Sequence, residues 1–219
     1  MPAEPATIDL PILYSFRRCP YAMRARLAIR ASGISVVLRE IVLRDKPAEL
    51  IEVSPKATVP VLLRPDATVL EQILDIMRGA LARDDPHGWL RVDETDDVQA
   101  LIDLNDGAFK QLLDRYKYAS RHPERSAADY RDEAIALMLS PLNDRLARHR
   151  HLLRNTASLA DMAIVPFVRQ FASVNSGWFA SAPLPHLQAW LAEITSSPLF
   201  DSVMAKFAPW RPGDEPVVF

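Results

Sequence analysis

One stretch near the N-terminus constrains the fold most strongly, because it places the only cysteine of the chain between a strand and a helix. The apolar run Ile12–Tyr14 predicts a strand. After Cys19 and Pro20, small and apolar side chains recur at helical spacing up to a stop signal at Gly33. Pro20 suits the first helical position, since that position needs no N–H donor. The sequence therefore predicts that the Cys19 thiol lies at the start of a helix.

This position has consequences for the chemistry of the thiol. Free N–H groups and the helix dipole favour negative charge at a helix N-terminus, and Arg17 and Arg18 add positive charge beside Cys19. Both effects favour the thiolate, which is the reactive form. The alternative is an inert structural thiol, since free cysteines are often buried. We interpret Cys19 as the candidate reactive group and keep the structural thiol as the alternative.

The first third of the chain alternates between strand and helix patterns. The predicted elements are a strand at 11–15, a helix at 20–32, a strand at 36–42, a short helix at 48–53, strands at 58–63 and 68–70, and a helix from Glu71 to about 82. The first three form a βαβ unit with parallel strands. The predicted order is therefore βαβαββα.

The rest of the chain shows a helical pattern only. Residues 84–97 are polar and contain glycine and proline, so we expect an interdomain linker there. From Val98 onward apolar side chains follow helical stripes. We therefore predict an α/β domain at 10–83, a linker at 84–97 and an all-helical domain at 98–210. The segment after Trp210 ends in apolar residues whose role the sequence does not indicate.

Composition excludes several classes of function. A formal net charge of −2 over 219 residues gives no electrostatic reason to expect binding to nucleic acid or to an anionic membrane. No apolar run reaches the length of a membrane span, and residues 1–9 read as a polar leader without a signal-peptide pattern. A single cysteine excludes a disulfide framework and a cysteine zinc cluster. We expect a cytoplasmic protein without a metal.

The Cys19-Pro20-Tyr21-Ala22 segment between strand and helix resembles the glutaredoxin-like half of the glutathione transferase family, especially its cysteine-type members such as the omega class. The resemblance extends over the chain after residue 9, through the Val59-Pro60 step, the helix start at Glu71 and a capping box at 158–161. It implies a thioredoxin-like α/β domain followed by an all-α helical bundle, and a homodimer. A dithiol glutaredoxin has a second cysteine where Ala22 stands, so an outside thiol must resolve any mixed disulfide at Cys19.

The resemblance also implies a glutathione site. In the family the bond before the equivalent of Pro60 is cis, and the residue at Val59 hydrogen-bonds the central cysteine of glutathione. Glu71 and Gln72 match the pair that holds the γ-glutamyl end, although the family usually has Ser or Thr at the second position. Lys46 matches a lysine of omega-class members and would meet the glycyl carboxylate. The alternative is that these residues have only structural or solvated roles.

For a second substrate the candidate residues are aromatic or cationic, and core packing or plain solvation is the alternative for each of them: Phe16, Arg17, Tyr21, Tyr118 and Trp178. We expect glutathione as co-substrate and thiol transfer or reduction of a small-molecule or protein mixed disulfide through Cys19. The alternatives are glutathione conjugation to electrophiles and a non-enzymatic, regulatory member of the fold. A route through the hydroxyls of Tyr14 or Ser15 is a further, weaker alternative.

Overall fold

The computed structural model describes residues 10–219 and divides the chain into two compact units. The first unit contains the chain up to Asp84 together with Ser202–Phe219, and the second contains Asp85–Asp201. The leader expected at residues 1–9 lies outside the described residues.

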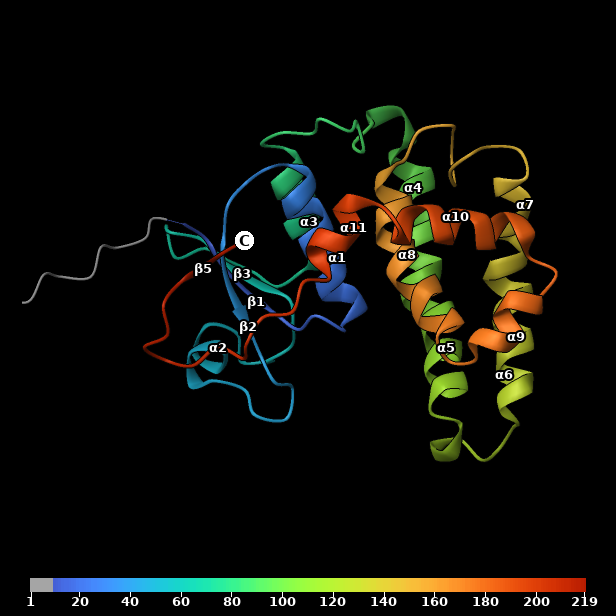
Figure 1. Cartoon of the computed structure of the whole chain (residues 1–219), viewed down its shortest axis with the longest axis horizontal. Coiled ribbons are helices and arrows are strands. Elements are labelled where there is room, and N and C mark those ends of the chain that lie inside the picture. The colour runs from blue at the N-terminus through green and yellow to red at the C-terminus, as the bar shows by residue number, and fades with distance from the viewer. Residues whose placement is uncertain (1–9) are drawn as a thin grey trace, which may run out of the picture. The chain divides into compact units, whose positions relative to one another are not determined.

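The first unit is built on a five-stranded sheet with the strand order β4-β3-β1-β2-β5 (Figure 1). The strands are β1 (Ile12–Ser15), β2 (Val37–Glu40), β3 (Val61–Leu63), β4 (Val69–Leu70) and β5 (Val217–Val218). β1 runs parallel to β2 and antiparallel to β3, so β1 is central. The cysteine loop follows the C-terminal end of β1. It therefore begins at the centre of the sheet and not beside an edge strand.

Three helices complete this unit: α1 (Pro20–Ala31), α2 (Ala48–Val53) and α3 (Ile73–Leu81). α1 and α3 pack against each other on one face of the sheet, and α2 lies on the other (Figure 1). Side chains alternate between the faces along β1, so that Tyr14 joins Leu50 of α2 in an apolar cluster with Val59 and Val61. The predicted βαβαββα order and thioredoxin-like fold are confirmed.

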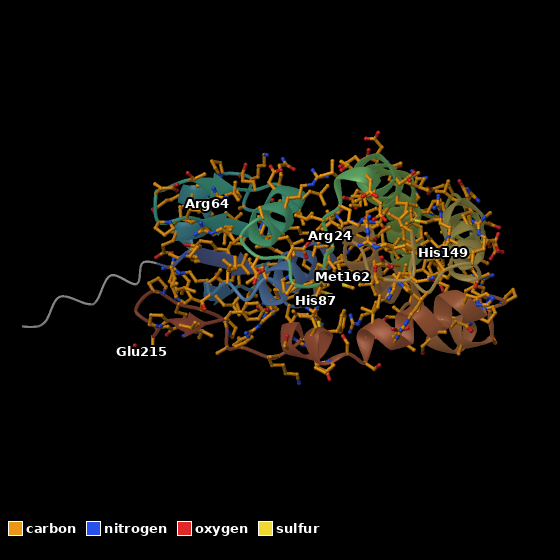
Figure 2. The ribbon with its side chains drawn as sticks, turned by 90° about the horizontal axis from the view of Figure 1, so that it is seen from above. Arg24, Arg64, His87, His149, Met162 and Glu215 are labelled. Atoms are coloured by element: carbon orange, nitrogen blue, oxygen red, sulfur yellow. The ribbon has the colours of Figure 1, made fainter. Side chains whose placement is uncertain are left out.

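The C-terminal segment adds a strand that the sequence analysis did not predict. β5 pairs antiparallel with β2, with Val218 opposite Val37, and the terminal Phe219 is buried. In Figure 2, Arg64, which follows β3, and Glu215, which precedes β5, lie at opposite edges of the sheet. Residues 202–219 thus belong to the first unit, whereas the predicted helical domain extended to 210.

The second unit is helical throughout its regular structure, as predicted. Its helices are α4 (Thr95–Leu104), α5 (Lys110–Lys117), α6 (Ala127–Ala134), α7 (Ser140–Leu146), α8 (Leu159–Ala172), α9 (Ser176–Ser181) and α10 (Pro185–Thr195), while α11 (Pro198–Val203) spans the boundary with the first unit. A π-helical turn joins α4 to α5 and another joins α6 to α7. The second of these turns ends at Leu139, and Pro141 lies in the first turn of the helix α7 that follows.

The region expected as a linker, 84–97, contains local structure. Its residues from Asp85 onward belong to the second unit, and α4 already begins at Thr95. The Asp85 carboxylate accepts hydrogen bonds from the N–H groups of Trp89 and Leu90, and the Trp89 side chain is buried.

Across residues 10–219, no helix has both the length and the apolar character that crossing a membrane requires.

Candidate functional site

Cys19 occupies the N-cap position of α1, directly before Pro20 at the first helical position. The loop from β1 reaches it through a tight turn in which the Cys19 N–H donates to the Phe16 carbonyl at 2.9 Å. The first N–H groups of a helix have no partners within the helix, so the half-buried thiol lies beside donors and the positive end of the helix dipole. This is the local arrangement that the sequence predicted.

The second element of the site is the turn before β3. Ala57 has a positive φ of 48°, a left-handed conformation that is uncommon for residues other than glycine, and its N–H donates to the Ser54 carbonyl at 2.7 Å. The following Val59–Pro60 peptide bond is cis, as predicted. The Cys19 thiol donates to the Val59 carbonyl, with Sγ and oxygen 3.7 Å apart. The cysteine and this backbone edge therefore face each other.

A cavity of about 460 Å³ opens at this contact, and its lining residues are Cys19, Tyr21, Leu43, Lys46, Ala57, Thr58, Val59 and Ile73. Its volume falls within the range of small-molecule sites. Three of the predicted glutathione-site and catalytic residues, Cys19, Lys46 and Val59, thus share one cavity with Tyr21. The apolar wall formed by Leu43 and Ile73 was not predicted, because an apolar side chain at a loop or helix start carries no distinctive sequence signal.

Glu71 and Gln72 are not among the residues that line this cavity, but they directly precede its lining residue Ile73. Helix α3 begins at Ile73, with Gln72 as an exposed N-cap whose side chain makes no capping hydrogen bond, so the expected helix start at Glu71 was two residues early. The Glu71 carboxylate accepts hydrogen bonds from the Ser54 hydroxyl at 2.5 Å and the Lys56 ammonium at 3.4 Å. The bond from Ser54, supported by Lys56, holds the pKa of the Glu71 carboxyl below its usual value.

The hydroxyls of Tyr14 and Ser15 are engaged elsewhere. Tyr14 is buried, its oxygen accepts a hydrogen bond from Arg39 at 2.5 Å, and burial raises the pKa of its phenol although Arg39 opposes this. The buried Ser15 Oγ accepts a hydrogen bond from Arg26 Nε at 2.8 Å. Neither residue lines the cavity at Cys19.

The residues expected at a second-substrate site fall into two groups. Phe16, Arg17 and Tyr21 belong to the first unit, where Phe16 packs against the apolar cluster around Tyr14 and only Tyr21 lines the cavity. The other two belong to the second unit. There Tyr118 is exposed at the end of α5, and Trp178 on α9 carries the Arg131 guanidinium 4.3 Å from its ring centroid.

No group of three or more His, Cys, Asp or Glu side chains that would suit a metal ion occurs within the part of the chain that the structure describes.

A thioredoxin-like unit with a cysteine at the start of its first helix, combined with a helical unit, defines the class of two-domain thioredoxin-like proteins. Residues 13–86 match the family model for the glutathione S-transferase N-terminal domain, and residues 104–198 match the model for the glutathione S-transferase C-terminal domain. The chain belongs to the glutathione S-transferase family.

Two curated relatives are similar in sequence. A probable glutathione transferase of Aplysia californica is 43% identical over 58 residues, which is 26% of this chain and 63% of the relative. Elongation factor 1-gamma 1 of Oryza sativa subsp. japonica is 27% identical over 214 residues, which is 88% of this chain and 48% of the relative. The chain therefore spans less than two thirds of the length of either relative.

Among solved structures, the chain is similar to a glutathione transferase family member from Pseudomonas fluorescens Pf-5 with two glutathione bound. The TM-score is 0.76 with 19% identity, and the match covers 91% of this chain and 95% of the other. At this identity the similarity shows the fold.

Proposed function

We propose that this protein carries out glutathione-dependent thiol transfer, with Cys19 as the nucleophile. The observation that carries the proposal is the cavity in which Cys19, at the N-terminus of α1, faces the Val59 backbone beside Lys46. Membership of the glutathione S-transferase family and the glutathione bound to the Pseudomonas fluorescens protein support glutathione as the co-substrate.

The proposed reaction has two exchange steps. The Cys19 thiolate attacks the glutathionyl sulfur of a mixed disulfide, which forms a Cys19–glutathione disulfide and releases the substrate as a thiolate that takes up a proton. A second glutathione, as its thiolate, then attacks the glutathionyl sulfur of this disulfide. Oxidised glutathione leaves and the Cys19 thiolate is restored. The sequence contains no second cysteine, so an external thiol is required for this step.

We assign the binding roles as follows. The Val59 backbone pairs with the central residue of glutathione, the Lys46 ammonium meets the glycyl carboxylate, and the Glu71 carboxylate receives the γ-glutamyl ammonium. The hydrogen bond from Ser54 orients this carboxylate and favours its anionic form, which is the form that can accept the ammonium. Gln72, at the N-cap of α3, offers an amide donor where the family usually has a hydroxyl.

The hydrogen bond from the Cys19 thiol to the Val59 carbonyl suggests how glutathione would activate the cysteine. A bond donated by the thiol stabilises its neutral form, whereas the helix N-terminus stabilises the thiolate. When glutathione takes the Val59 carbonyl as its acceptor, the neutral form loses this support while the effect of the helix remains. Binding of the co-substrate would therefore favour the thiolate beyond the effect of the helix alone.

The first test combines the intact mass of the protein after incubation with oxidised glutathione and the pH dependence of Cys19 alkylation. We expect a single glutathione adduct, and alkylation with a midpoint below the ordinary thiol pKa of about 8.5. Cys19→Ser should abolish both the adduct and the thioltransferase activity. Unchanged activity in Cys19→Ser, or alkylation of the native protein only at ordinary thiol pH, would overturn the proposal.

A non-catalytic role is the second candidate. It is favoured by the similarity to elongation factor 1-gamma 1 over 88% of this chain and by Gln72 in place of a hydroxyl residue. It predicts a folded protein that shows no binding of millimolar glutathione in calorimetry and no turnover. Conventional conjugation is distinguished by a higher rate with a chlorodinitrobenzene-type electrophile than with a mixed disulfide.

We further propose a cytoplasmic homodimer, on the basis of family membership. Light scattering that gives the mass of a single 24.6 kDa chain would refute the dimer.

A further inference from the structure

The loop that carries Cys19 is held by a buried carboxylate on the neighbouring strand. Glu40, the last residue of β2, is 7% exposed, and its Oε1 accepts the backbone N–H of Arg17 at 2.6 Å. Arg17 lies two residues before Cys19 and inside the turn closed by the bond from the Cys19 N–H to the Phe16 carbonyl. Glu40 therefore fixes the backbone of this turn at a point close to the sulfur.

The carboxylate is itself held by Arg26, a residue of α1 that is fully buried. Arg26 Nη2 forms an ion pair with Glu40 Oε2, Nε donates to Ser15 Oγ at 2.8 Å, and Nη1 donates to the Val203 carbonyl at 3.1 Å. Each nitrogen of the guanidinium has an acceptor, and each acceptor lies on a different element. The position of the guanidinium, and with it that of the Glu40 carboxylate, is therefore fixed.

The C-terminal segment closes this arrangement. It supplies the Val203 carbonyl to Arg26, and the Trp210 N–H donates to the backbone carbonyl of Glu40 at 2.7 Å. The ring of the buried Phe219 lies 5.6 Å from the Arg26 guanidinium carbon. Residues of the C-terminal segment, about 180 positions away in sequence, thus fix the Arg26–Glu40 pair, and this pair in turn holds the loop that carries Cys19.

We propose that Arg26 and Glu40 are positioning residues for Cys19: the Glu40 carboxylate, fixed by Arg26, holds the Arg17 N–H and thereby keeps the Cys19 sulfur at the N-terminus of α1. The inference rests on the proposed function only in that Cys19 is the reactive group. It assigns neither residue a contact with a substrate.

The chemistry of the pair supports a positioning role over plain stabilisation. A buried ion pair replaced by apolar side chains of similar volume often leaves stability unchanged or improved. Apolar side chains, however, provide no acceptor for the partly buried Arg17 N–H, and an N–H that loses its partner in such a place raises the free energy of the loop conformation that contains it. An oxygen at the position of Glu40 Oε1 is therefore needed to hold the loop at Arg17, and not to keep the unit folded.

Two double variants separate these roles. R26M/E40M removes the charges and the acceptor, whereas R26M/E40Q removes the same charges but keeps an amide oxygen that can accept the Arg17 N–H. In both variants Ser15 and Val203 lose the same partner, so each serves as the control for the other. The measurements are the rate of Cys19 alkylation by iodoacetamide across pH 5–10 and the midpoint of urea unfolding.

We expect R26M/E40Q to alkylate about threefold more slowly than the native protein, because its amide oxygen still accepts the Arg17 N–H but is no longer fixed by Arg26. R26M/E40M should be about tenfold slower at pH 7, with its midpoint shifted toward the ordinary thiol pKa of about 8.5. Equal profiles in the two variants overturn the proposal, whatever their stability. If Cys19 of the native protein alkylates with the pH dependence of an ordinary thiol, the proposed function fails. The positioning role is then judged separately: a slower absolute alkylation rate in R26M/E40M than in R26M/E40Q supports it, and equal rates refute it.

A second measurement on the native protein needs no variant to fold. Amide hydrogen exchange of Arg17 should be at least about 100-fold slower than that of its exposed neighbour Arg18, because the Arg17 N–H donates to a buried carboxylate. Exchange of both amides at the same rate would contradict the proposal.

Discussion

The Asp161 side chain is fully buried at the start of α8. Its carboxylate accepts the N–H of Leu152 at 3.0 Å, the N–H and hydroxyl of Ser158 at 2.9 and 2.6 Å, and the indole N–H of Trp190 at 2.9 Å. The capping box expected at 158–161 is therefore present, and its acid also joins the loop before α8 to helix α10.

The magnitude of the effect follows from the number of donors. Asp161→Ala leaves three N–H groups without an acceptor, and a buried unsatisfied donor costs about 1–3 kcal/mol. We therefore expect the free energy of unfolding to fall by about 4 kcal/mol or more, a large part of the total stability of an ordinary domain. Asp161→Asn keeps one acceptor oxygen and should lose about half as much.

The assay is urea unfolding monitored by circular dichroism, with Asp129→Ala as the matched control. Asp129 forms the equivalent capping box with Ser126 at the start of α6, but on an exposed surface where water can replace the carboxylate. We expect a clearly smaller loss for Asp129→Ala. Equal losses in the two variants would refute the reasoning, because burial would then have no influence on the cost.

The same group makes a prediction about pH. Burial acts to raise the pKa of the Asp161 carboxyl, but the His151 ring, Ser158 and the Leu152 N–H together hold this pKa below its usual value. The stability that the carboxylate contributes is therefore present above pH ~4 and is lost as the pH falls through the lowered pKa. The difference in unfolding free energy between the native protein and Asp161→Asn should shrink in that acid range, and a constant difference would contradict the assignment.

Three further predictions follow from the site and the C-terminus. Ser54→Ala removes the hydrogen bond that lowers the pKa of Glu71, so the Glu71 carboxylate should take up its proton at a higher pH. On acidification, calorimetry should therefore show the loss of glutathione binding at a higher pH in this variant than in the native protein. Lys46→Met should weaken glutathione binding about tenfold and reduce its dependence on salt, because a cation at the cavity is removed. Phe219→Ala should lower the free energy of unfolding by about 3 kcal/mol in urea titrations, since the terminal ring is 3% exposed.

Much of the first unit could be predicted because its signals are local. A proline after Cys19 and helical spacing beyond it determine where the thiol lies, and the structure places Cys19 at the N-cap as expected. The element order was likewise accessible from residue types and spacing, whereas the cis bond at Val59–Pro60 was expected only from the family resemblance. The start of α3 was predicted two residues early, because an acid before an apolar run is typical of a first helical turn. In the structure Glu71 precedes the helix, and its carboxylate accepts a hydrogen bond from the Ser54 hydroxyl.

The C-terminal segment shows why the remainder was out of reach of sequence reasoning. Val217-Val218-Phe219 is too short to show a strand period, and what makes it a strand is the free edge of β2, far away in sequence. The same holds for Arg26, whose helical spacing gave no sign of burial. Its side chain is buried because Glu40, Ser15 and the Val203 carbonyl meet there only after β1, β2, α1 and the C-terminal segment have assembled. A residue whose role depends on partners from three other elements has no local signature, so the features that hold the Cys19 loop in place could be identified only from the folded chain.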